Sequence, residues 1–164
     1  GRSMAAELIA RQLGELEPTV TVVRVDHVPG FATSGTSIDL GRIDADAVDA
    51  LVSVEQSTVL VIDDAESLSL PMVQALERLV DANNGHVRII ATTTLDAARS
   101  VRSWTSKIRG SGVGILIGGA PSDGEIFRVR LGPLPGRGSI PGRANLIMRG
   151  QVVGMQLAYL NAAT

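Results

Sequence analysis

Residues 58–64, TVLVIDD, decide the fold of this chain of 164 residues. Five β-branched and aliphatic residues follow one another without polar alternation, which is typical of a strand buried on both faces of a parallel sheet. The run ends in two carboxylates, Asp63 and Asp64, at the edge where open α/β sheets bind ligands. Adjacent carboxylates repel each other and lose solvation, so a cation is their natural partner. A solvated turn at the end of the strand, DDAES, explains the same residues equally well.

The composition limits what this chain can be. Hydrophobic residues make up 45% and aromatic residues only 2%, so we expect a single domain, residues 1–164, with an aliphatic core. The absence of cysteine excludes a disulfide scaffold and a thiolate metal site. No apolar run approaches the roughly 18 residues that a membrane-spanning helix needs, so we expect no membrane segment in this chain.

Charge is distributed unevenly along the sequence. The net charge is −2, but residues 1–80 carry five basic and thirteen acidic side chains, and residues 81–164 carry ten and four. One interpretation is an acidic and a basic flank that pack head to tail between neighbouring copies. Mixing of the charges in space is the alternative.

The first residues combine a polar tripeptide with a helical pattern. Gly1, Arg2 and Ser3 match the last three positions of the phosphate-binding loop G-x-x-x-x-G-K-[ST], with arginine in place of lysine. Such a loop opens a helix because its backbone N–H groups attract phosphate, and an apolar stripe at Ala5, Leu8, Ile9, Gln12, Leu13 and Leu16 predicts that helix. The upstream glycines are missing, so we expect the chain to begin within the loop. An ordinary helix cap is the alternative.

Strands and helices are expected to alternate along the rest of the chain. Strands are predicted at 20–26, 58–63, 87–92 and 113–117, and helices after Asp44, from Pro71 and over 95–108. Exposed segments are predicted at 29–41 and 121–142, and a hairpin turning at Arg149 and Gly150 ends the chain. We therefore predict an α/β fold of three layers, in which the four strands form one mainly parallel sheet with 59–62 central and helices on both faces. Trp104 is expected to be a packing residue.

Taken together, these pieces resemble the FtsK/SpoIIIE family of hexameric ATPase motors, and most closely the later ATPase domains of EccC, the motor of type VII (ESX) secretion. The resemblance covers nearly the whole chain. Residues 1–3 are similar to the end of the phosphate loop, 59–64 to the Walker-B strand, and 89–93 to the strand that ends Ala-Thr-Gln in DNA translocases. Residues 111–119, Asp123-Gly124 and 141–147 are similar to the C-terminal segment of EccC domains.

This resemblance implies a RecA-like P-loop NTPase domain with ATP and Mg²⁺ as cofactors. The implied nucleotide-binding residues are Gly1, Arg2, Ser3, Asp63, Thr92 and Thr93. Ser3 and Asp63 would hold the metal ion, and Asp64 would be the catalytic acid. The implied partners are other ATPase domains in a ring hexamer and a secreted protein, at the cytoplasmic face of the membrane within a larger protein.

Three departures from the family pattern predict weak or no hydrolysis. Arg2 replaces a lysine and is bulkier and planar. Asp64 replaces a glutamate, which withdraws the carboxylate by about one methylene group, and Thr93 stands where the translocases have a glutamine that senses the γ-phosphate. Phosphoryl transfer depends on positioning and charge, so small displacements can abolish turnover while binding survives.

Three other hypotheses stand beside this one. A DNA-translocase domain shares the fold, but a charge of −2 and few aromatic residues provide no evident DNA platform. A receiver-like or flavodoxin-like signalling domain would carry its acidic pair after the first strand, whereas here only Asp26 follows that strand. A non-enzymatic interaction or substrate-docking module that retained the fold competes closely with nucleotide binding.

Overall fold

In the computed structural model, the chain divides into two compact units, residues 2–94 and the residues from Leu95 onward. The structure describes residues 2–17, 21–25, 37–38, 44–82, 85–100, 104–132 and 142–157, and for 21–25 and 37–38 the backbone alone. Gly1 lies outside these ranges. The first unit is a parallel sheet with helices, and the second is built on an antiparallel sheet, so the chain is a mixed α/β protein.

The first unit contains a four-stranded parallel sheet in the order β2-β1-β3-β4. Its strands are β1 (Thr21–Val25), β2 (Ser37–Ile38), β3 (Thr58–Ile62) and β4 (Val87–Ala91). Its helices are α1 (Arg2–Leu16), α2 (Ala45–Ala50) and α3 (Leu70–Ala82), with single 3₁₀ turns η1 (Leu51–Ser53) and η2 (Ala65–Ser67). The predicted interior position of β3 is confirmed, because β1 and β4 flank it.

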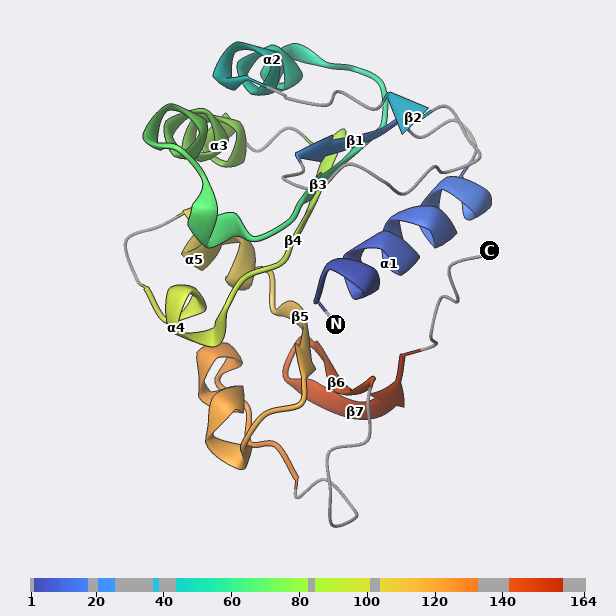
Figure 1. Cartoon of the computed structure of the whole chain (residues 1–164), viewed down its shortest axis with the longest axis vertical. Coiled ribbons are helices and arrows are strands. Elements are labelled where there is room, and N and C mark those ends of the chain that lie inside the picture. Colours follow the sequence, from blue (N-terminus) through green and yellow to red (C-terminus); the bar gives the residue numbers. More distant parts are fainter. Residues whose placement is uncertain are drawn as a thin grey trace. The chain divides into compact units, whose positions relative to one another are not determined.

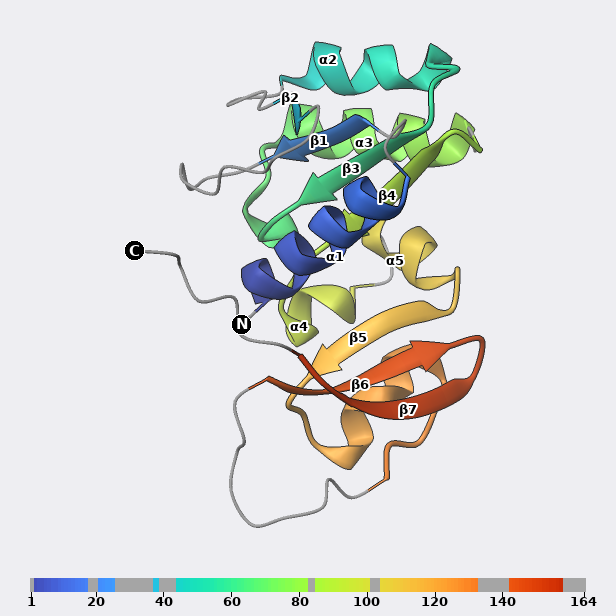
Figure 2. The same ribbon diagram turned by 90° about the vertical axis from the view of Figure 1, so that its right-hand side faces the viewer.

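Strand β3 is the core of this unit. All five of its residues are buried, as the uninterrupted apolar run predicted. Val59 and Val61 pack against Ala6 and Ala10 of α1. Alternation along the strand directs Leu60 and Ile62 to the opposite face, on the side where α2 and α3 lie (Figure 1). Figure 2 looks onto the face of the sheet that α1 covers, with α1 in front of the strands and α3 behind them.

The face that α1 turns to the sheet differs from the predicted stripe. The buried residues are the alanines Ala5, Ala6 and Ala10, whereas Leu16 is 78% exposed and Gln12 is also exposed. Small side chains allow the helix to approach the sheet closely. The periodicity therefore indicated the helix correctly and its buried face in part: Ala5 is buried and Leu13 packs against the core, but Ala6 and Ala10 were missed.

Polar contacts fix the helix ends. The Asp44 carboxylate accepts a hydrogen bond of 2.9 Å from the Ala47 N–H and caps α2, as predicted. Arg78 of α3 forms a two-pronged ion pair with Asp49 of α2, at 2.8 and 2.5 Å. At the far end of α1, Arg88 of β4 holds Glu17 at 2.9 and 2.6 Å.

The second unit contains a three-stranded antiparallel sheet in the order β5-β6-β7. Its elements are α4 (Leu95–Ala98), α5 (Trp104–Arg109), β5 (Val113–Ile117), the 3₁₀ helix η3 (Pro121–Phe127), β6 (Arg143–Met148) and β7 (Gln151–Gln156). The predicted hairpin is confirmed: Arg149 and Gly150 both have positive φ, of 48° and 83°, as a tight two-residue turn requires.

Three predictions for this region are wrong. Residues 113–117 form a strand, but β5 pairs antiparallel with β6 rather than extending the parallel sheet, whose fourth strand is β2 in the predicted loop 29–41. In the described part of the predicted helix 95–108 there are two short helices, because α4 ends at Ala98 and residues 99–100 are not helical. The predicted surface segment 121–142 contains η3, and its Leu131 is only 4% exposed.

Two further sequence inferences concern packing and membranes. Trp104 is 2% exposed, which confirms its role as a packing residue. Among the described helices, none combines the length and the apolar composition that crossing a bilayer needs.

The burial of β3 predicts a contrast between two leucines. Leu60→Ala should lower the free energy of unfolding by about 2–5 kcal/mol, because it leaves a cavity in the core. Leu16→Ala should change it by less than about 0.5 kcal/mol, because Leu16 is 78% exposed. Urea unfolding followed by circular dichroism measures both values, and equal losses would contradict the assignment of β3 as the core strand.

Candidate functional site

The candidate site lies at the carboxyl edge of the parallel sheet in the first unit. Ile62 and Ala91 are register partners at the ends of β3 and β4, so the residues that follow them emerge side by side. These residues are Asp63 and Asp64 after β3, and Thr92 and Thr93 after β4. Arg2, at the first turn of α1, reaches the same edge. The structure thus brings together the predicted residues Arg2, Asp63, Asp64 and Thr92.

Thr92 links the two strand ends through its hydroxyl group. The hydroxyl donates a short hydrogen bond to the Asp63 carboxylate and accepts one of 2.9 Å from the Asp64 N–H. Its backbone continues the connection, because the Thr92 N–H donates to the Ile62 carbonyl and the Thr92 carbonyl accepts from the Ala65 N–H, both at 2.9 Å. Only 9% of Thr92 is exposed, so these bonds are largely shielded from water.

Asp64 adopts an unusual backbone conformation, with φ 49° and ψ 58°. This is the left-handed region, which aspartate tolerates better than most residues because its short side chain bonds locally. The conformation ends β3 and starts the 3₁₀ turn η2, whose Ser67 N–H donates to the Asp64 carbonyl at 2.8 Å. Backbone strain of this kind concentrates at functional sites.

Arg2 bridges two carboxylates of this edge. One guanidinium nitrogen lies 3.0 Å from Asp64 Oδ1, and the other lies 3.2 Å from Glu66 Oε1. Glu66 also accepts from the Thr94 N–H at 3.2 Å. The sequence prediction did not include Glu66. The sequence did contain an indication of Glu66: it is a third acid, two residues beyond Asp64, in a segment whose carboxylates need a cation.

The electrostatics of Glu66 reflect these contacts. Partial burial is the largest influence and raises the pKa of Glu66. A hydrogen bond from its own backbone N–H, the nearby Thr93 hydroxyl, and the hydrogen bond and positive charge of Arg2 together outweigh burial, so the pKa is lowered overall. The Thr93 hydroxyl acts on this carboxylate without the geometry of a regular hydrogen bond, and its Oγ1 is buried without a partner among the described residues.

Other predicted site residues are not brought together. Ser3 is exposed on α1, and among the described residues no hydrogen bond joins it to Asp63, its predicted partner in holding a metal ion. The prediction for Gly1 falls outside the described residues. In the described ranges, no group of three or more histidine, cysteine, aspartate or glutamate side chains is placed to hold one metal ion.

As arranged, these residues do not fit a Mg²⁺–triphosphate complex. The guanidinium that should meet phosphate is held by Asp64 and Glu66, and the Asp63 carboxylate accepts the Thr92 hydroxyl. A triphosphate would have to displace both ion pairs and approach three carboxylates. The arrangement is chemically an acidic edge whose three carboxylates are only partly compensated by one arginine.

Comparisons with known proteins add no assignment: no family model, no curated protein and no solved structure matches this chain.

The two threonines after β4 allow a matched test of the site. Thr92→Val removes the hydroxyl that joins Asp63 to the Asp64 N–H, so it should lower the free energy of unfolding by about 1–3 kcal/mol. Thr93→Val removes a buried hydroxyl that lacks a partner and should be neutral within about 0.5 kcal/mol, or stabilising. Thermal and urea unfolding measure both. A larger loss for Thr93→Val would show that the hydrogen-bond assignment is wrong.

Replacing Arg2 should change how stability depends on pH. The pKa of Glu66 is lowered in the folded state, so its ionisation stabilises the fold above the unfolded-state pKa. That stabilisation is lost as the pH falls through the folded-state pKa. Arg2→Gln should raise the Glu66 pKa and weaken the loss of stability in acid.

The measurement is a ¹³C NMR titration of the Glu66 carboxyl group, together with unfolding at neutral and acidic pH. Arg11→Gln is the matched control, because Arg11 pairs with Glu15 on the same helix, at 2.9 Å. If both variants shift the Glu66 titration equally, the Arg2 contact is not its cause.

Proposed function

We propose that this chain is a degenerate ATPase-type domain of the FtsK/SpoIIIE class, similar to a later domain of the EccC motor of type VII secretion. The observation that carries the proposal is the Arg2–Asp64–Glu66 cluster at the carboxyl edge of β3. In this cluster Arg2, which stands where a phosphate loop has its lysine, contacts Asp64, the second acid after a strand similar to Walker B. A RecA-like three-layer architecture belongs to this proposal, supported by the parallel order β2-β1-β3-β4.

The same cluster explains weak or absent hydrolysis. A catalytic acid must be free to orient water, but Asp64 is engaged by a guanidinium at 3.0 Å. Phosphoryl transfer depends on cations that point at the phosphate, and Arg2 points at carboxylates instead. In this proposal ATP and Mg²⁺ remain the family cofactors, and the domain's main contribution is contact with neighbouring ATPase domains and with a secreted protein, at the cytoplasmic face of a membrane.

A second candidate is a non-enzymatic interaction module with the same fold. The observation that favours it is again the pairing of Arg2, because a guanidinium already held by two carboxylates of its own chain is not available to a phosphate. A DNA-translocase function is less well supported, since the chain carries a net charge of −2 and the site exposes three acids.

Binding of Mg-ATP and release of phosphate distinguish these functions. We expect no phosphate release above background and ATP binding no tighter than about 1 mM, which corresponds to about −4 kcal/mol. Asp64→Asn removes one of the two ion pairs of Arg2, while the pair with Glu66 remains, and it removes one repulsive charge, so it should tighten ATP binding by about threefold to tenfold. Asp46→Asn, on the exposed start of α2, makes the same charge change away from the site and is the control.

Each outcome assigns the domain. Tighter binding by Asp64→Asn alone supports a degenerate nucleotide site. If neither the parent chain nor either variant binds ATP, the interaction module becomes the better assignment and the degenerate nucleotide site is rejected. Steady phosphate release that Asp64→Asn abolishes would show an active ATPase and overturn the degenerate assignment.

A further inference from the structure

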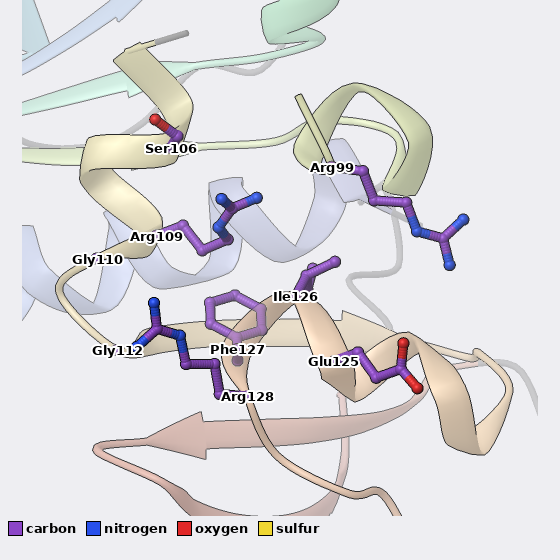
Figure 3. Close-up of a pocket in the computed structure, with 9 residues that line it drawn as sticks. All are labelled: Arg99, Ser106, Arg109, Gly110, Gly112, Glu125, Ile126, Phe127 and Arg128. Carbon is purple, nitrogen blue, oxygen red and sulfur yellow. The ribbon is translucent and has the colours of Figure 1, made fainter. Parts of the chain in front are cut away.

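The second unit contains a cavity with three arginines in its wall. Its volume is about 680 Å³, which lies within the range of small-molecule sites. Figure 3 shows its lining: Arg99 follows α4, Arg109 ends α5, and Glu125, Ile126, Phe127 and Arg128 come from the end of η3. All of these residues belong to the same unit, so the described lining of the cavity comes from this unit.

The three arginines differ in how far their charge is compensated. Arg99 lies 3.2 Å from an oxygen of Asp96 and 3.3 Å from one of Asp123, so acids offset it. Arg109 donates to the Ala98 carbonyl at the end of α4, a neutral acceptor. Within the described part of the chain, Arg128 makes no side-chain hydrogen bond, and neither Arg109 nor Arg128 has a carboxylate partner. Two cations without a carboxylate partner among the described residues therefore line the cavity, which also contains the carboxylate of Glu125.

The cavity is also polarised and partly apolar. In the view of Figure 3, Arg109 and Arg128 lie on one side of Ile126, and Glu125 and Arg99 lie on the other. The Phe127 ring rests on the bare backbone of Gly114, where a Cβ atom would lie 2.1 Å from the ring. The ring is thus held in place by β5, and it offers a fixed apolar surface beside the two cations.

The backbone at Arg128 is unusual for so bulky a residue. Its φ is 57° and its ψ is 32°, the left-handed conformation that usually falls to glycine or asparagine at the end of a helix. Its N–H donates to the Glu125 carbonyl at 2.9 Å, which closes η3. An arginine in this position gains nothing for the turn, so the side chain itself needs a role.

We propose that this cavity binds a phosphomonoester, with the phosphate group held by Arg109 and Arg128 and an apolar body against Ile126 and Phe127. Planar guanidinium groups match phosphate oxygens in pairs. A phosphate monoester carries nearly two negative charges at neutral pH, which matches Arg109 and Arg128, whereas a carboxylate would match only one of them; Glu125 lies on the other side of Ile126 in the view of Figure 3. The volume exceeds what a lone phosphate ion fills, so an organic body completes the fit.

Phenyl phosphate is the probe, because it joins a ring to a phosphate group. We expect it to bind more tightly than inorganic phosphate, which lacks the ring, and than benzoate, which lacks the second charge. Two-dimensional ¹H–¹⁵N NMR titration should show amide shifts concentrated at Gly112 and Phe127. Arg128→Asn should weaken binding about tenfold, as the loss of a charge-assisted contact predicts.

Two controls keep this test sharp. Asparagine accepts the left-handed backbone, so Arg128→Asn should fold as well as the parent chain. Arg130→Asn removes the same charge two residues away and outside the cavity lining, and should leave affinity within twofold. If Arg128→Asn fails to fold, the amide shifts of the parent chain decide whether the ligand binds in this cavity: shifts at Gly112 and Phe127 support the proposal, and shifts elsewhere contradict it.

Three results would overturn the proposal: no binding of phenyl phosphate at about 10 mM, well beyond ordinary ligand affinities; equal binding of benzoate or of inorganic phosphate; or equal weakening by Arg130→Asn. The last would mean attraction by general positive charge alone.

Discussion

The complete burial of β3 is the constraint on which the first unit depends. A strand with no exposed face needs a neighbour on each edge and a helix layer on each side, and β1, β4, α1 and the α2–α3 pair supply these. Parallel neighbours bring their carboxyl ends to one edge. The acids after β3 and the threonines after β4 therefore meet because the apolar strands that precede them are packed side by side.

Thr92 then converts this proximity into a defined geometry. Its hydroxyl both donates and accepts, so one side chain orients the Asp63 carboxylate and satisfies the N–H of Asp64. Asp64 can adopt its left-handed backbone because that N–H is satisfied and because its short side chain tolerates the conformation. Thr93, the next residue, has a buried hydroxyl without a partner in the described region, so two identical residues in sequence have opposite local roles.

The sequence predicted the local elements better than their partners. Strands 58–62, 87–91 and 113–117 and the final hairpin follow from apolar runs and turn residues, which are local signals. An apolar run indicates burial but not which strand lies beside it, so β5 was assigned to the wrong sheet. The buried face of α1 was predicted only in part: Ala5 and Leu13 lie on it, but Ala6 and Ala10 were missed because alanine carries a weak hydrophobic signal.

The same holds for the candidate site: the sequence predicted which residue types lie there, but not which residues contact one another. The residue types at the strand ends predicted an acidic edge that needs a cation, and the cation is Arg2, which was expected to face phosphate. Glu66 escaped prediction because only the 3₁₀ turn after Asp64 brings it back toward α1.

Arginine suits this arrangement better than lysine, since its two terminal nitrogens can each contact a different carboxylate in a fixed geometry. The side chains of Arg2 and Asp64 are 40% and 45% exposed, so water screens their attraction and it adds little to stability. The ion pairs therefore set the charge and position of the site, while the apolar core holds the fold, and the chemistry of this edge can change without loss of the structure beneath it.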